Sequence, residues 1–151
     1  MTISSLSAAR LACEIRNWEL TNLELQKILY IAHVAHLGSL DRPLIEEPFE
    51  AWDFGPVIAN LYHYIKGFGS NKIGNVFRSI HRPEINTTEH DYISGAVNAT
   101  KSMSAWQLVE FTHKPNGAWI KSYVPGKRGQ IISTESILDE YHEWKSRFQS
   151  K

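Results

Sequence analysis

The segment that follows Thr21 constrains the fold most, because apolar side chains occupy nearly every side of the helix that it predicts. Thr21 and Glu24 have the spacing of a capping box, in which the hydroxyl accepts a backbone amide and the carboxylate reaches back to the cap. The helix therefore begins at Asn22, and Gly38 with Ser39 predicts its end. Its apolar residues form more than one stripe: Leu23, Ile28, Leu29, Ile31, Ala32, Val34, Ala35 and Leu37. Burial on most sides requires neighbours all around, so we expect this helix at the centre of the molecule.

Apolar periodicity and N-cap patterns predict five further helices. They begin behind Ser4 or Ser5, at Pro56, behind Thr88, behind Ser104 and behind Ser133 or Thr134. The helix from Pro56 is expected to bury one stripe and to stop at the glycines 67 and 69; the stripe is Ile58, Leu61, Tyr62 and Ile65. The final helix has the clearest apolar face: Ile137, Leu138, Tyr141, Trp144 and Phe148. Residues 71–84 have no clean period, which predicts a loop.

A short aromatic segment, residues 49–52, lies between Pro48 and Gly55 and predicts an edge strand. Ile131 and Ile132 are its expected partner. The length of 151 residues is that of one ordinary domain. The expected fold is mainly α, with about six helices and a small two-stranded β element, in a single compact domain over residues 1–151.

The charge balance argues against several classes of partner. Sixteen Lys and Arg residues match sixteen Asp and Glu residues, so no global field attracts nucleic acid or an anionic membrane. Cys13 is the single cysteine and cannot form an internal disulfide. The first residues lack the character of a secretory signal and no apolar run is long enough to span a bilayer, so we expect a cytoplasmic protein.

Residues that could support chemistry are few. His33 and His36 are three apart on the central helix, but no cluster of Cys, Asp or Glu accompanies them, and we expect a structural role and no metal or other cofactor. Four carboxylates near the strand and His113 could supply acids and a base. The sequence has no nucleophile elbow, phosphate-binding loop or metalloprotease helix. We therefore expect no catalytic residues and no enzyme activity.

Several blocks of the chain resemble the Panacea domain, the SocA-like antitoxin family of bacterial and phage toxin–antitoxin systems. These blocks are residues 25–33, 46–57 and 108–113, the pair Ala118-Trp119, and the tail 131–148. The matching motif residues are Lys27, Tyr30, Glu50, Trp52, Gly55, Pro56, Thr112, His113 and Trp119. One departure is Ala118, which stands where the family pattern has a proline.

The resemblance implies a mostly helical antitoxin, not an enzyme, that binds and neutralises a protein toxin encoded by an adjacent gene. Within the family, an alternative is a proteolytic adaptor that delivers the toxin to an ATP-dependent AAA+ protease. A third reading is a DNA-binding regulator of its own operon. For the third, the sequence offers only a small basic loop with Lys121, Tyr123, Lys127 and Arg128.

The motif residues have structural interpretations as well as toxin-binding ones. If Glu50 is buried, it needs a partner, and Lys27 is the candidate. Thr112 and His113 lie near a helix end, where a threonine can bond an upstream carbonyl and an imidazolium favours the helix dipole. Tyr62, Tyr64 and Phe68 are the candidates for partner binding, because the buried stripe cannot use all three.

Overall fold

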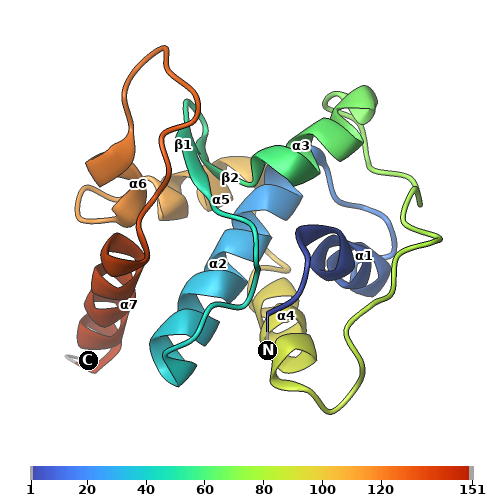
Figure 1. The fold of residues 1–151 in the computed structure, drawn as a ribbon, viewed down its shortest axis with the longest axis horizontal. Coiled ribbons are helices and arrows are strands. Elements are labelled where there is room, and N and C mark those ends of the chain that lie inside the picture. The colour runs from blue at the N-terminus through green and yellow to red at the C-terminus, as the bar shows by residue number, and fades with distance from the viewer. Residues whose placement is uncertain (1, 150–151) are drawn as a thin grey trace.

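The computed structural model describes residues 2–149, with side chains described through residue 147, and its central element is helix α2, Asn22–Leu40. The helices with the most extensive contacts to α2 are α1 (Ser5–Ile15), α4 (Thr88–Ala99), α5 (Ala105–Thr112) and α7 (Thr134–Gln149). Figure 1 shows α2 running through the molecule with α1 and α4 on one side and α7 on the other. The predicted central position is confirmed, and Thr21 and Glu24 form the expected capping box.

The end of α2 differs from the prediction. The helix continues past Gly38 to Leu40, and Asp41 closes it in the left-handed conformation with φ 54° and ψ 35°. Gly38 has a different role, because a Cβ placed on it would lie 2.0 Å from Cγ of Tyr141 on α7. The glycine therefore permits the close approach of two helices and does not terminate one.

A β-hairpin follows α2. Strand β1 (Glu50–Trp52) pairs antiparallel with β2 (Gly55–Val57), and the register places Ala51 opposite Pro56. The expected helix start at Pro56 is wrong, because Pro56 lies in β2 and α3 (Ala59–Ile65) begins three residues later. Proline is tolerated both at a helix start and on an edge strand, because its missing amide is not needed at either place, so local sequence does not distinguish the two.

The other side of β1 contacts the segment before α7. The amide of Ala51 donates to the carbonyl of Gln130 at 2.8 Å, and the amide of Ile132 donates to the carbonyl of Phe49 at 2.8 Å. A single bridge joins Glu50 and Ile131. The predicted pairing is confirmed, although the second strand of the sheet is β2.

The remaining helices mostly begin where their caps predict. Ser4 caps α1 and Ser104 caps α5 with a full capping box, whereas Thr87 caps α4, one residue before the expected Thr88. A 3₁₀ turn, η1 (Lys66–Phe68), follows α3, and α6 (Ala118–Ser122) is a five-residue helix that the periodicity did not predict because it is too short. The inward position predicted for Phe148 lies outside the described side chains. Across residues 2–149 the fold is mostly helical, with seven α-helices and one two-stranded sheet.

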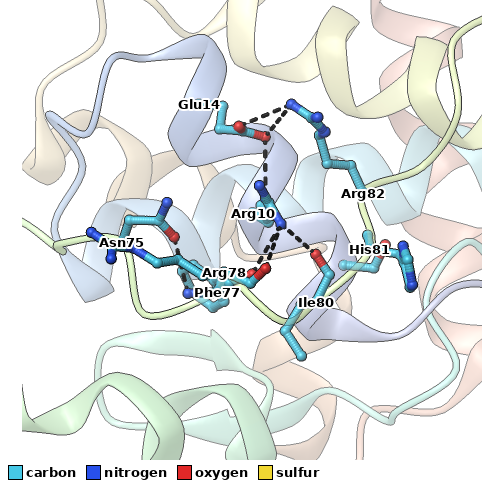
Figure 2. Close-up of polar contacts among 9 residues, drawn as sticks. Arg10, Glu14, Asn75, Phe77, Arg78, Ile80, His81 and Arg82 are labelled. Carbon is cyan, nitrogen blue, oxygen red and sulfur yellow. Dashed lines mark hydrogen bonds and ion pairs between the residues drawn. The ribbon is translucent and has the colours of Figure 1, made fainter.

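Residues 71–84 form the expected long loop, and α1 holds it in place. Figure 2 shows the guanidinium of Arg10 donating to three carbonyls of this loop, those of Phe77, Arg78 and Ile80. Glu14, one turn further along α1, forms an ion pair with Arg82 at 3.0 Å.

Among the described helices, none is both long enough and apolar enough to cross a membrane.

Candidate functional site

Gly55 lies where three of the motif residues meet. Its φ of +110° belongs to a region that residues with a side chain rarely adopt. A Cβ on Gly55 would lie 2.8 Å from Cε of Lys27, 3.2 Å from Oγ1 of Thr112 and 3.2 Å from Cε1 of His113. Helices α2 and α5 therefore press against the hairpin at this residue, and only glycine fits.

Lys27 is fully buried beneath the hairpin. Its ammonium donates to the carbonyl of Pro56 at 3.0 Å. Burial lowers the pKa of Lys27 from 10.5 to about 7, because a charge removed from water has no carboxylate here to compensate it. The lysine thus connects the central helix to β2 through a carbonyl and not through an ion pair.

The expected pairing of Lys27 with Glu50 is wrong. Oε1 of Glu50 accepts from Nε1 of Trp52 at 2.9 Å and from the amide of Gly129 at 3.1 Å. The alternation of a strand explains the difference, since Glu50 and its neighbour Ala51 lie on opposite faces. Glu50 is only half-buried and turns toward the loop before α7, away from α2.

Aromatic residues attach the hairpin to α6. The indole of Trp119 donates to the carbonyl of Trp52 at 2.7 Å, and its ring centroid lies 3.8 Å from that of His113. Tyr123 stacks on Trp119 at 4.4 Å and donates its hydroxyl to Oδ1 of Asp53 at 2.6 Å. These contacts fix the position of the hairpin turn.

Thr112 and His113 make the contacts that their place at a helix end predicts. The buried hydroxyl of Thr112 donates to the carbonyls of Leu108 and Val109, both at 3.1 Å. Nδ1 of His113 lies 2.8 Å from the same Val109 carbonyl, and the residue caps α5. Both side chains thus complete the end of the helix.

Tyr30 is the motif residue that lies apart from the hairpin. Its hydroxyl donates to Oε1 of Glu140 on α7, and the amide of Ala118 donates to the same oxygen at 3.1 Å. A proline at position 118 would have no amide to donate. Where this chain departs from the family pattern, the amide of Ala118 therefore has an acceptor in Glu140. Burial raises the pKa of Glu140 above its usual range. Sequence reasoning missed Glu140, although Ile137 and Tyr141 place it on the inward face of α7.

A cavity of about 660 Å³ opens beside the hairpin. The start of α2, the hairpin turn, the residues after η1 and residues 126–128 surround it. Its lining consists of Thr21, Asn22, Leu23, Gln26, Lys27, Trp52, Asp53, Phe54, Val57, Tyr62, Gly69, Ser70, Ala105, Gly126, Lys127 and Arg128. The guanidinium carbon of Arg128 lies 4.1 Å from the ring centroid of Trp52 and 5.8 Å from that of Tyr62.

Of the three side chains expected to bind a partner, Tyr62 lines this cavity. Tyr64 stacks on Phe77 at 5.7 Å and donates to the carbonyl of Val76, so it joins α3 to the long loop. Phe68 is half-buried and packs against the core. The structure therefore does not bring the three together on one surface.

The predicted basic loop is also divided. Lys121 lies 3.5 Å from Asp139 on α7, whereas Lys127 and Arg128 face the cavity. The contact between Arg128 and the ring of Trp52 was not predicted from the sequence. The two residues are 76 positions apart, so no local pattern connects them.

The two histidines of α2 contact backbone groups. Nδ1 of His33 accepts from the amide of Ile45 at 3.3 Å, and Nδ1 of His36 lies 2.9 Å from the carbonyl of Arg42. Burial lowers the pKa of His33 to about 4, and the nearby His36 adds to this shift. Within the described residues no group of three His, Cys, Asp or Glu side chains has the arrangement of a metal site.

Comparison with known proteins decides the family. Residues 25–120 match the family model described as antitoxin SocA-like, Panacea domain. The chain belongs to this Panacea family. It is 35% identical over 109 residues to Antitoxin SocA of Caulobacter vibrioides (strain NA1000 / CB15N). That alignment covers 66% of this chain and 58% of the relative, so the chain spans less than two thirds of that protein's length. No solved structure matches the chain.

The matched part of this Panacea chain runs from Leu25 in α2 into α6 and contains the hairpin and all nine motif residues. Residues 126–132, which contact β1 and line the cavity, lie outside the match. Eight of the nine motif residues, all except Tyr30, lie in or against the hairpin or at its junction with α5 and α6. The contacts described above account for them as packing and hydrogen bonding. The cavity beside these residues, whose lining includes Arg128 and Tyr62, gives a partner access to this otherwise packed region.

Proposed function

We propose that this chain is an antitoxin that neutralises a cognate protein toxin by binding it directly, the toxin being the product of an adjacent gene. Membership of the SocA-like antitoxin family is the observation that carries the proposal. The action is stoichiometric and needs no chemical step. We infer that it takes place in the cytoplasm, where a toxin made in the same cell would be met.

The surface around the cavity supports binding as the mode of action. Tyr62, Trp52 and Arg128 gather at the cavity, and aromatic residues and arginine are the types enriched at protein interfaces. Phe54 adds an aromatic side chain that is 65% exposed. Such residues supply most of the energy of a protein complex when a partner covers them.

Co-expression tests the proposal. The neighbouring open reading frames are expressed one at a time from an inducible promoter, with and without this chain. We expect one product to arrest growth and co-expression of this chain to restore it. The two proteins should then co-purify in a fixed ratio, with the toxin present at the same level as without the antitoxin.

Two results would overturn direct neutralisation. In the first, no neighbouring product is toxic, or growth recovers although no complex forms. In the second, the toxin disappears upon co-expression and reappears in cells that lack an ATP-dependent protease, which would establish the adaptor role instead. A mobility shift with the promoter DNA of the operon distinguishes the regulator role.

A further inference from the structure

The cavity beside the hairpin has the size and the walls of a binding pocket. Its volume of about 660 Å³ exceeds the space of a few waters and falls in the usual range of ligand pockets. Leu23, Val57 and the ring of Trp52 supply apolar wall. A partner group that fills this space is therefore apolar over most of its surface.

The charges at the cavity are mostly positive. Lys127 and Arg128 lie on its wall, and Asp53 is the carboxylate among its lining residues. Asp53 already accepts the hydroxyl of Tyr123 at 2.6 Å. In the described part of the chain, the side chains of Lys127 and Arg128 form no hydrogen bond or ion pair with a protein group. They are available to an incoming anion.

Arg128 is already positioned for such an anion. Its guanidinium carbon lies 4.1 Å from the centroid of the Trp52 ring, a cation–π contact that restrains a long side chain. The N–H groups of an arginine held in this way can still donate to a carboxylate, which a guanidinium matches in bidentate geometry. The ordering of Arg128 before binding lowers the entropy lost when a partner arrives.

An exposed aromatic residue extends the apolar surface at the cavity. Phe54 in the hairpin turn lines the cavity and is 65% exposed. A large apolar side chain left in water beside a pocket is typical of an interaction site of a protein. A small molecule confined to the cavity would leave most of Phe54 in water, whereas a protein segment crossing the opening would cover it.

We propose that the toxin docks at this cavity through an acidic segment: an apolar side chain enters the cavity, and an aspartate or glutamate within a few residues of it pairs with Arg128 and Lys127. This inference rests on the proposed function and names the surface through which it acts. It moves the expected binding surface from Tyr64 and Phe68 to the opening between α2, the hairpin and residues 126–128.

Calorimetric titration with the toxin identified by the growth assay tests the charge at this site. Arg128→Glu should weaken the Kd by roughly thirtyfold or more, as expected for a central interface residue. Asp53→Asn should tighten it by about threefold, because the asparagine oxygen still accepts Tyr123 while one repelling charge is removed. Lys145→Glu, an equal reversal at an exposed position of α7, should leave the Kd within about twofold.

A second measurement reads the partner's chemistry directly. A photo-crosslinking phenylalanine analogue at the exposed position of Phe54 should attach to one toxin peptide, and mass spectrometry identifies it. We expect an Asp or Glu within about four residues of the crosslink, the reach of one extended segment. A crosslinked peptide without a nearby carboxylate overturns the proposal.

The outcomes separate this inference from the proposed function. If the wild-type chain binds the toxin but folded Arg128→Glu binds equally well, or if Asp53→Asn weakens binding, the docking site is wrong and direct neutralisation stands. If the wild-type chain binds no toxic neighbour, both fail together. Circular dichroism and melting of each variant establish that a loss of binding is not a loss of fold.

Discussion

At the scale of single residues, the hairpin site depends on groups placed where their chemistry is unfavourable in isolation. Lys27 is an amine buried beside a carbonyl and not beside a carboxylate. Gly55 has a backbone conformation that would be strained for any residue with a Cβ. Each is compensated by its surroundings, the first by the Pro56 carbonyl and the second by the absence of a Cβ. Both can be tested by substitution.

Lys27 should give the free energy of unfolding a characteristic pH dependence. Its pKa is about 7 in the folded chain and 10.5 in the unfolded chain, so between these values the unfolded state binds more protons. The cost of burying the amine is therefore full below pH 7 and declines as the pH rises toward 10.5. From pH 7 to pH 9, stability should rise by about 2 kcal/mol from this group.

Denaturant unfolding at several pH values measures this dependence. In Lys27→Met the rise should be absent, and the difference between the two proteins should be largest at the lowest pH. Lys145→Met, at an exposed position of α7, is the matched control and should keep the wild-type profile. Parallel profiles of wild type and Lys27→Met would contradict the buried, shifted amine.

Gly55→Ala should destabilise the protein by about 3 kcal/mol, because the φ of +110° is strained for alanine and the added Cβ meets Lys27 and Thr112. Gly67→Ala is the control, since a Cβ there meets nothing within 4 Å. That variant should change stability by less than about 0.5 kcal/mol. Equal effects of the two substitutions in thermal unfolding would argue against the close packing of α2 and α5 at Gly55.

At the scale of elements, features that depend on neighbouring residues could be predicted from the sequence, and features that depend on distant ones could not. The capping boxes at Thr21 and Ser104 involve residues three positions apart, and both helices begin where the pattern indicates. Pro56 and Gly38 have two local interpretations each, and their partners, Ala51 and Tyr141, decide between them.

The candidate site shows the same limit. The motif residues were identified in the sequence, but the partner of Glu50 is the amide of Gly129, which lies 79 positions away in a loop without periodicity. Local spacing cannot report such a contact. The contact between Arg128 and the ring of Trp52 could not be predicted for the same reason.

The crossing of α2 and α7 at Gly38 supplies a prediction at this scale. Gly38→Ala places a Cβ 2.0 Å from Cγ of Tyr141, in the body of a ring and not at the end of a flexible chain. The helices must separate, which should cost about 2 kcal/mol or more despite the better helix propensity of alanine. Equilibrium unfolding provides the measurement.

Gly95→Ala in α4 is the matched control for this substitution. A Cβ at Gly95 meets nothing within 4 Å, so alanine should stabilise that helix by about 0.5–1 kcal/mol. The two glycine substitutions thus have opposite expected signs. Stabilisation by Gly38→Ala would show that the helices do not pack as described.

At the scale of the whole molecule, the region that matches the family model is too small to bury the central helix by itself. The match covers residues 25–120. Helix α1, helix α7 and the first residues of α2 lie outside it. α1 and α7 both pack against α2, and Glu140 of α7 supplies the acceptor for Tyr30 and for the amide of Ala118. The flanking helices therefore complete the core.

A fragment limited to residues 25–120 should not form the native fold. Removing α1 and α7 takes away two of the helices that cover α2, whose apolar side chains are buried in the full chain. We expect the fragment to show a broad, non-cooperative thermal transition and to bind a hydrophobic dye, while the full chain unfolds cooperatively. A cooperative transition of the fragment at the wild-type temperature would contradict this view of the core.

The bond between Lys27 and Pro56 also determines how other chains can approach the sheet. On the outer edge of β2, Pro56 has no amide to donate, and the ammonium of Lys27 already occupies its carbonyl. On the outer edge of β1, the backbone groups of Phe49 and Ala51 bond to residues 130–132. A foreign strand therefore finds neither a donor nor an open acceptor at Pro56 with which to extend the sheet. The hairpin is thus closed to edge-to-edge association, and contacts that a partner makes beside it must come from side chains.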